Sequence, residues 1–271
     1  MVFYGVLFLS GVLGGVLAGM LGIGGGIIYV FVLDAYLVDV GVIEQEYAHY
    51  IISNSLFCVF FASLSSCVNL IRHKEFYYKQ VLLLGVPAVI ASICTLLFVV
   101  NSHWFTREVF SYVIMVLLIY MLFRTIRKVA RKEVDIELDG IPSSGLAIAG
   151  GLGGVVASLS GLGGGVVMVP VMNGFFKINM KIAKSISLGV IVMSSLAVSI
   201  VNSTFESVSI ISVFHVGVLV IPVTLVIIVG VVIGGPLGVV FARKLQARQV
   251  SIIYSVFLGL FILKKAYDLY L

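Results

Sequence analysis

The segment Gly22-Ile23-Gly24-Gly25-Gly26 lies inside a long apolar stretch, and the chain repeats it as Gly161-Leu162-Gly163-Gly164-Gly165. The likeness extends outward from both segments. Residues 11–32 and 150–171 are identical at twelve of twenty-two positions, at a constant shift of 139. So many matches exceed what a composition rich in Gly and Val gives by chance. The chain therefore contains an internal duplication, which is common among membrane transporters.

The consecutive glycines predict a break in a helix at each copy of the segment. A glycine in a helix interior costs about 0.5–1 kcal/mol relative to alanine, and these runs contain several. The neighbouring glycines at spacing four, in 11–15 and in 150–154, instead suit close packing between helices in a membrane. We therefore expect packing stripes that lead into two broken helices, a pattern typical of secondary transporters.

Composition places the chain in the membrane. Of its 271 residues, 61% are hydrophobic and 11% are charged, and the mean hydropathy is +1.22. A soluble domain of this length does not bury so much apolar surface. We interpret the net charge of +5 as a topology signal, so no nucleic-acid partner is expected. Cys58, Cys67 and Cys94 lie in apolar runs at spacings that suit no metal site or disulfide framework, and no metal or cofactor is expected.

The charges between the apolar stretches predict how the chain crosses the bilayer. The stretches cover roughly 2–33, 50–71, 81–100, 109–123, 141–174, 185–204, 215–240 and 250–263. If both glycine-containing stretches are simple crossings, ten basic residues face the cytoplasm and seven face outside. If each is a hairpin that enters and leaves on one side, the count becomes fourteen against three. The positive-inside rule favours hairpins. Length agrees, because 32 residues of helix would span about 48 Å across a core of about 30 Å.

We therefore expect an all-α integral membrane protein with two inverted-topology repeats, each a glycine-broken re-entrant hairpin plus three transmembrane helices. The first repeat covers 1–127, a cytoplasmic linker covers 128–142, and the second repeat covers 143–271. Both termini and the acidic loop 34–48 are expected outside, in a multi-pass protein of the plasma (inner) membrane. The uncharged segment 207–242 is interpreted as one tilted or kinked crossing with an interfacial lead-in.

The glycine segments also predict a binding site. A helix that starts after each segment exposes N–H groups without helical partners and a partial positive charge. Two such starts that meet near the midplane would bind an anion without a buried Lys or Arg. No predicted crossing has a central carboxylate for a cation, so an anion or a neutral polar solute fits. The candidate binding residues are Gly24, Gly25, Gly26, Gly163, Gly164, Gly165, Ser55, Ser187 and Asn54.

The polar candidates have a structural alternative. Ser55 and Ser187 occupy matching places in the spans that follow the two segments. A serine in a membrane helix usually bonds a carbonyl of its own helix or a neighbouring helix, so both interpretations stay open. Asn54 has an isoleucine, Ile186, as its counterpart in the second repeat. His49 fits an interfacial histidine better than a proton relay.

Further motifs carry a family resemblance. The two glycine segments occur together with Val169-Pro170-Val171, Ser55-Leu56, Ser187-Leu188 and Gly234-Gly235-Pro236-Leu237-Gly238. This set resembles the sulfite exporter TauE/SafE family of membrane permeases over essentially the whole chain. The resemblance implies a secondary transporter for a small sulfur-containing anion (sulfite, thiosulfate or an organosulfonate) in a prokaryotic plasma membrane. The chain departs from the family where Phe31 replaces a proline and where Asn54 and Ile186 replace threonines.

Other functions make different demands on the sequence. A channel needs a continuous polar pore, whereas these spans offer scattered serines. An enzyme needs convergent catalytic groups at depth, whereas His49, His73, His103 and His215 all fall near span ends, so we do not expect an enzyme. An accessory or assembly protein of a sulfur or respiratory complex, without transport of its own, is the further alternative. The expected partners are the anion and the lipid bilayer, with a homo-oligomer and the coupling ion left open.

Overall fold

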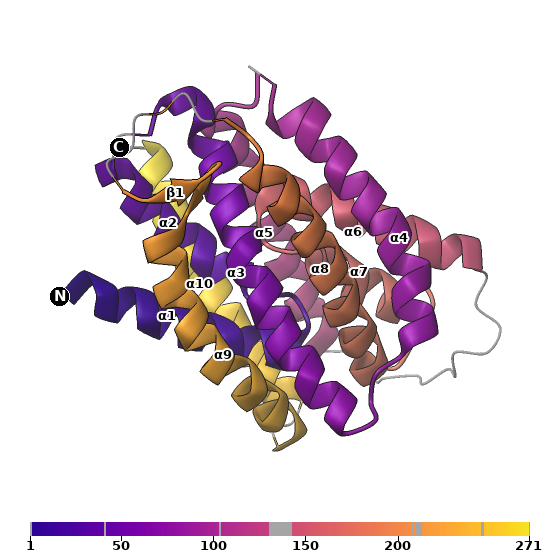
Figure 1. The fold of residues 1–271 in the computed structure, drawn as a ribbon. Coiled ribbons are helices and arrows are strands. Elements are labelled where there is room, and N and C mark those ends of the chain that lie inside the picture. Colours follow the sequence, from indigo (N-terminus) through magenta and orange to yellow (C-terminus); the bar gives the residue numbers. More distant parts are fainter. Residues whose placement is uncertain are drawn as a thin grey trace.

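The computed structural model describes residues 2–40, 42–102, 104–129, 143–206, 209, 213–244 and 247–270. These residues form a bundle of helices (Figure 1). In chain order the helices are α1 (Val2–Leu21), α2 (Gly26–Val40), α3 (Glu44–Arg72), α4 (Tyr78–Thr95) with its π-helical continuation η1 (Leu96–Val100), α5 (Arg107–Val129), α6 (Ser143–Ser160), α7 (Gly165–Gly174), α8 (Met180–Ser203), α9 (Ile221–Lys244) and α10 (Ala247–Tyr270). A small antiparallel hairpin of β1 (His215–Val216) and β2 (Leu219–Val220) precedes α9.

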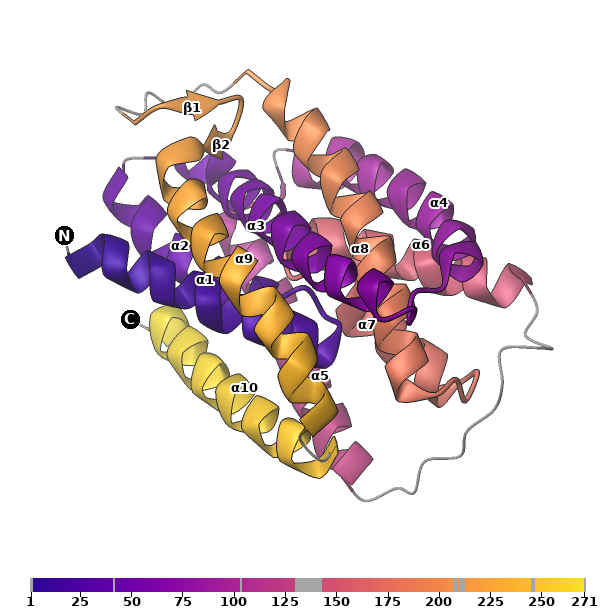
Figure 2. The ribbon, with the colours of Figure 1, turned by 60° about the horizontal axis from the view of Figure 1, so that its bottom comes forward.

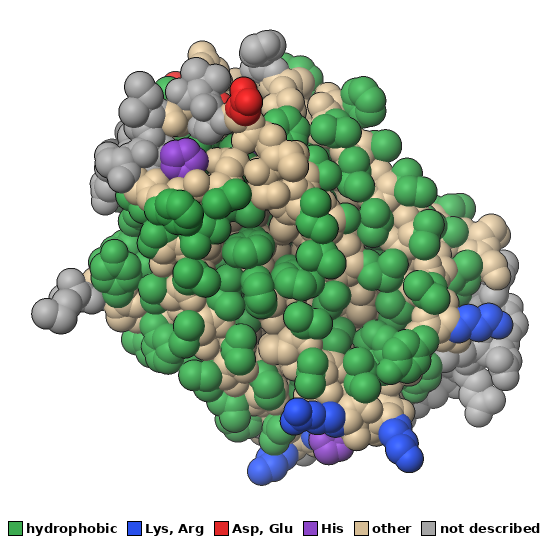
Figure 3. Space-filling view, in the orientation of Figure 1, with side chains coloured by type: hydrophobic (Ala, Val, Ile, Leu, Met, Phe, Trp, Pro, Cys, Tyr) green, Lys and Arg blue, Asp and Glu red, His purple; other side chains and the backbone are tan. Residues whose placement is uncertain are grey.

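The lengths and apolar compositions of the helices suit a lipid bilayer. Within the described ranges, six are long and apolar enough to cross a membrane, namely α1, α3, α4 with η1, α6, α8 and α9. The helices that follow the glycine segments, α2 and α7, have shorter apolar lengths. Hydrophobic side chains cover the middle of the face seen in Figure 3, with Lys and Arg at its lower edge and an acidic group near its upper edge. The chain is a multi-pass membrane protein, as predicted.

Helix α3 defines the two ends of the bundle. It begins with Glu44 and Glu46, at what we call the acidic end, and it finishes at Arg72, at what we call the basic end. The negative charges suit the start of a helix, where unpaired N–H groups carry partial positive charge. Helix α9 also finishes at the basic end, where Arg243 forms a 2.8 Å ion pair with Glu75 in the loop after α3.

Glycine stripes bring pairs of helices into backbone contact. A methyl group on Gly15 of α1 would lie 2.8 Å from the amide nitrogen of Gly235 in α9. A methyl group on Gly154 of α6 would lie 2.9 Å from the carbonyl carbon of Ala88 in α4. The close packing predicted for these stripes is therefore confirmed. Contacts advance in the same direction along both members of each pair, so α1 runs parallel to α9 and α4 runs parallel to α6. Figure 2 shows both pairs side by side.

Both glycine segments interrupt their helices. Helix α1 stops at Leu21 and α2 starts at Gly26, and the ring of Phe3 stacks on the ring of Tyr36 at 5.2 Å. The second helix therefore returns along the first to the acidic end. The same break separates α6 from α7 at residues 161–164. The predicted helix breaks are confirmed in both copies.

Two other predictions meet the structure here. Among its described residues, the uncharged segment 207–242 forms one helix, α9, with the β-hairpin as its lead-in, which agrees with the prediction of one crossing. The acidic loop predicted at 34–48 is wrong at its start, because α2 continues to Val40 and buries Asp34. The linker predicted over 128–142 lies, from residue 130 onward, outside the described residues.

Candidate functional site

The two glycine turns meet in the middle of the protein. A methyl group on Gly24 would lie 2.8 Å from Val59, halfway along α3, and 3.6 Å from Ile191, halfway along α8. The equivalent methyl group on Gly163 would touch the same two side chains at 3.3 and 3.8 Å. Helices α3 and α8 are the most buried of the candidate spans, with 67% of their apolar windows buried against 39–44% in α4, α6 and α9. The turns therefore sit at the centre of the protein, and α3 and α8 hold them there.

The turns touch through backbone atoms. A methyl group on Gly26 would lie 2.6 Å from the carbonyl oxygens of Gly161 and Leu162, and one on Gly165 would lie 2.8 Å from the Cα of Ile23. Gly24 and Gly163 have φ angles of +85° and +88°, a conformation that side-chain-bearing residues rarely adopt. Glycine is therefore needed in both turns, for the path of the chain and for the contact between turns.

Each glycine turn is hydrogen-bonded to a serine from the opposite half of the chain. Ser55 of α3 donates its hydroxyl hydrogen to the carbonyl oxygen of Gly161 at 2.7 Å, with the Gly26 carbonyl oxygen at 3.4 Å. Ser187 of α8 donates to the carbonyl oxygen of Gly22 at 2.9 Å. The structure thus brings together the predicted glycines and both predicted serines. Each hydroxyl hydrogen is already engaged in this conformation, so it becomes available to a ligand only when the turns separate.

The starts of α2 and α7 keep unpaired donors at this junction. The first N–H groups of a helix have no partner within the helix. The N–H groups of Gly26, Ile27 and Gly165 have no hydrogen-bond acceptor among the described residues. The next donors are satisfied locally, as when the Ile28 N–H binds the Gly25 carbonyl at 3.2 Å. Two helix starts with unsatisfied donors therefore converge at one buried point, where an anion would be stabilised.

Asn54 lies near these residues but serves a different contact. Its Nδ2 donates to the carbonyl oxygens of Tyr50 at 2.8 Å and Val218 at 2.9 Å, and its Oδ1 accepts the Val220 N–H at 2.7 Å. The amide thus holds the β-hairpin against the acidic-end half of α3. About one turn earlier on α3, the Nε2 of His49 lies 2.9 Å from the Oδ1 of Asn202. Both N–H donors of the Asn54 amide are engaged here, so neither is free for an anion, and its predicted role in binding stays a prediction.

Lys184 and Tyr29 also border the first turn, and neither is among the residues predicted from the sequence. The ammonium of Lys184 donates to the carbonyl oxygen of Met20 at 2.7 Å, and its Cα packs against Gly22. A cation is stabilised at a helix C-terminus, and here it also adds positive charge beside the turn. The available signal was its position, three residues before Ser187. For Tyr29 the signal was a single hydroxyl within the apolar run after the first segment.

A charged cluster at the acidic end is also new. Asp34 of α2 is 6% exposed and forms a 3.3 Å ion pair with Lys265 of α10, which is 5% exposed. The hydroxyl of Tyr47 donates to the Asp34 carboxylate at 3.0 Å, and the guanidinium of Arg107 lies over the Tyr47 ring. The sequence predicts Asp34 in the acidic loop and Lys265 beyond the last apolar stretch, whereas the structure buries both. The cluster ties α2 to α3, α5 and α10.

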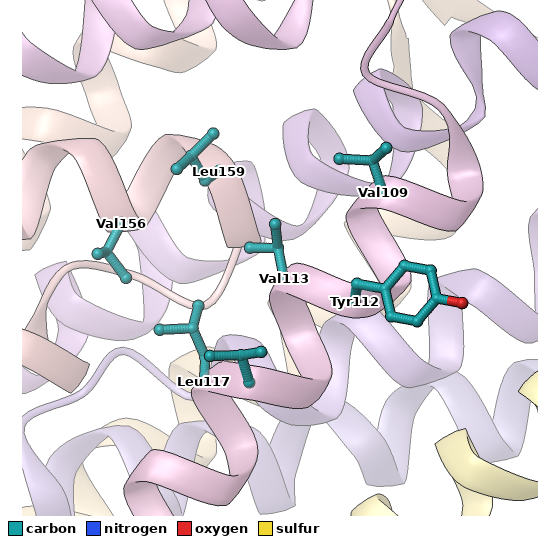
Figure 4. Close-up of a pocket in the computed structure, with 7 residues that line it drawn as sticks. Val109, Tyr112, Val113, Leu117, Val156 and Leu159 are labelled. Atoms are coloured by element: carbon teal, nitrogen blue, oxygen red, sulfur yellow. The ribbon is translucent and has the colours of Figure 1, made fainter.

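An apolar groove between α5 and α6 does not suit a small anion. It has a volume of about 380 Å³. Its lining consists of Val109, Tyr112, Val113, Val116, Leu117, Val156 and Leu159. Figure 4 shows the Tyr112 hydroxyl turned away from the other labelled side chains. Without a polar group directed inward, the groove fits hydrocarbon better than a charged solute.

Comparisons with known proteins agree on the class of the chain. The family model described as "Sulfite exporter TauE/SafE" matches residues 7–264. A probable membrane transporter protein of Methanocaldococcus jannaschii is 26% identical over 263 residues, covering 94% of this chain and 92% of that protein. The probable membrane transporter protein YunE of Bacillus subtilis is 30% identical over 273 residues, covering 93% of each. No solved structure matches the chain.

Proposed function

Since the chain belongs to the sulfite exporter TauE/SafE family of membrane transporters, we propose that it is a secondary transporter of a small anion. The anion is sulfur-containing (sulfite, thiosulfate or an organosulfonate), and the membrane is the plasma membrane. The observation that carries the proposal is the convergence of the starts of α2 and α7 at one buried point with unpaired N–H groups. Partial positive charge from two helices favours an anion there.

The proposed architecture is a pair of inverted repeats. In this arrangement α1–α2 enters the membrane from the acidic end and returns to it, whereas α6–α7 enters from the basic end. Three features support it: α1 starts beside the start of α9, α6 starts beside the start of α4, and both turns lie at mid-length of α3 and α8. Non-helical backbone at membrane depth is tolerated when it is buried in protein, as these turns are. With the basic end in the cytoplasm, both termini lie outside.

The groups around the turns favour a negatively charged substrate over a neutral one. Lys184 brings a cation beside Gly22, and the buried carboxylate of Asp34 is paired with Lys265. A neutral polar solute would not use the charge of two helix starts. Backbone N–H groups would bind the anion first, and the Ser55 and Ser187 hydroxyls would join when their carbonyl partners move away. Transport then amounts to exposing this point to one side of the membrane at a time.

Reconstitution into proteoliposomes tests the proposal. We expect saturable movement of at least one anion from a panel of sulfite, thiosulfate, methanesulfonate and sulfate. A carrier saturates and shows no unitary conductance, whereas a channel shows discrete current steps. Absence of movement for every anion in the panel, with correctly folded protein, would contradict the proposal and favour the accessory-protein alternative.

A further inference from the structure

The two glycine turns differ in chemistry at one pair of equivalent positions. Tyr29 is the fourth residue of α2, and Met168 is the fourth residue of α7. Each side chain packs back on the first helix of its own hairpin, Tyr29 against Gly14 and Met168 against Gly153. Those two glycines are themselves equivalent in the duplication. The two side chains therefore pack in the same way, but one turn borders a phenol and the other a thioether.

The Tyr29 hydroxyl is buried without a partner. The residue is 0% exposed, and within the described part of the chain its oxygen has no hydrogen-bond partner. A methyl group on Gly25 would lie 3.2 Å from that oxygen, so the hydroxyl borders the turn itself. A buried hydroxyl without a partner is unfavourable, and phenylalanine would fill the same volume without that cost. Ser53 and Ser63 also carry unpaired hydroxyls; Tyr29 combines this property with contact to a glycine turn.

Met168 offers no donor to the equivalent turn. A methyl group on Gly164 would lie 3.0 Å from its terminal carbon, so its thioether end borders the second turn. A thioether is soft, polarizable and poorly hydrated. The first turn thus offers N–H groups and a hydroxyl, whereas the second offers N–H groups and a soft apolar surface.

We propose that Tyr29 is a specificity-determining residue, which donates its hydroxyl hydrogen to one oxygen of the bound anion while Met168 contacts the anion's less hydrated side. This inference rests on the proposed anion site between the turns. The anion then binds in one orientation, because the two turns offer it different side chains. An unsymmetrical anion such as thiosulfate is favoured over sulfate, which has the same charge and a similar shape but four equivalent oxygens.

The variant Tyr29→Phe gives effects of opposite sign on stability and on binding. Removal of an unpaired hydroxyl leaves the ligand-free protein equally stable or more stable, measured by thermal unfolding in detergent. The same change weakens thiosulfate binding about tenfold to a hundredfold, the usual loss for one hydrogen bond to a charged group. Sulfate affinity falls less, so the preference for thiosulfate over sulfate shrinks. A purely structural tyrosine would not move this ratio.

A position swap provides the matched control. Tyr29→Met places a thioether at both turns and should weaken thiosulfate binding as Tyr29→Phe does. The double variant Tyr29→Met/Met168→Tyr keeps the same two side chains in exchanged turns, and it should recover most of the lost affinity. The swap also decides the matter if Tyr29→Phe does not fold.

The outcomes separate the two proposals. Wild-type protein that binds thiosulfate, with Tyr29→Phe weakened and the swap restored, supports the inference. Equal thiosulfate affinity in the wild type and Tyr29→Phe overturns the role of Tyr29 and leaves the anion transporter standing. Wild-type protein that binds no anion of the panel overturns the proposed function, and the inference with it.

Discussion

The hydroxyl of Ser187 donates a 2.9 Å hydrogen bond to the carbonyl oxygen of Gly22, which is 165 positions earlier in the chain. Ser55 makes the matching bond to Gly161 in the other direction, at 2.7 Å. Helices α3 and α8 thus each form a hydrogen bond to the glycine turn of the opposite half of the chain. Neither half can rearrange its turn without breaking a bond to the other, so the two turns are coupled.

We expect Ser55→Ala and Ser187→Ala each to impair transport strongly. Loss of one bond to a backbone carbonyl should lower the free energy of unfolding by about 0.5–1.5 kcal/mol, while the proposed ligand bond is worth about 1.5–3 kcal/mol. Transport affinity should therefore fall roughly tenfold to a hundredfold while the protein still inserts. Proteoliposome uptake and thermal unfolding measure the two effects.

The matched control for the serines is Ser199→Ala. Ser199 is also buried on α8, but its hydroxyl bonds Ser195 of the same helix at 2.7 Å. This variant should transport normally. If Ser55→Ala and Ser187→Ala both behave like Ser199→Ala, the serines are packing residues and the site lies elsewhere.

Asn54→Leu should release the β-hairpin. The change leaves the buried carbonyl of Val218 and the N–H of Val220 without partners, which costs about 1–3 kcal/mol. A cysteine placed at Val218, which is 2% exposed, should then react with a water-soluble maleimide much faster than in the parent. Asn173→Ala is the control, because it also removes an amide bond to backbone, but to Ile178. Unchanged labelling in Asn54→Leu would contradict the role of Asn54 in holding the β-hairpin against α3.

The buried pair Asp34–Lys265 should be far more sensitive than the exposed pair Glu75–Arg243. Removing one partner of a buried pair leaves an uncompensated charge and costs about 3–5 kcal/mol, whereas exposed pairs contribute about 0–1 kcal/mol. We therefore expect Asp34→Asn to lower the unfolding temperature markedly and Glu75→Gln to change it little. The double variant Asp34→Asn/Lys265→Met should recover part of the loss. A small effect of Asp34→Asn alone would show that the charge is solvated.

Labelling of single cysteines tests the proposed orientation. In a variant whose three native cysteines are replaced, Glu44→Cys at the acidic end should react with an impermeant reagent added outside intact cells. Lys79→Cys, in the first turn of α4 at the basic end, should react only after the membrane is opened. The reverse pattern would overturn the assignment of the basic end to the cytoplasm.

Local pattern and long-range contact explain which features the sequence could predict. The breaks before Gly26 and Gly165 follow from consecutive glycines, and the duplication marks Ser55 and Ser187, so both are visible in the sequence. The bond partners of the serines are not, because Ser55 and Gly161 are 106 positions apart. The hydrogen-bond partners of Asn54 could not be predicted either, because they lie in a β-hairpin more than 160 positions away.

Residues such as Asp34, Lys184 and Tyr29 were missed for a different reason. Asp34 falls where the apolar run gives way to acidic residues, and only its packing against Lys265 shows that it is buried. Lys184 resembles the basic residues of the preceding loop until α8 places it beside Gly22. Composition alone does not reveal which side of a helix end faces a neighbouring turn.

Transport by alanine variants of the two glycine turns tests the central claim, a single anion site shared by both halves. Gly25 has a φ of +72° and Gly164 a φ of −65°, so only the first is strained by conformation. A methyl group would nevertheless collide with the first helix of the hairpin in both, at the carbonyls of Gly14 and Gly153. Gly151→Ala is the control, because its methyl group meets open space.

We predict that Gly25→Ala and Gly164→Ala each abolish thiosulfate or sulfite uptake in proteoliposomes although both variants insert and unfold cooperatively, while Gly151→Ala transports normally. Full uptake by either Gly25→Ala or Gly164→Ala would show that the two turns do not share a site, and loss of activity only in proportion to loss of stability would reduce both glycines to packing residues.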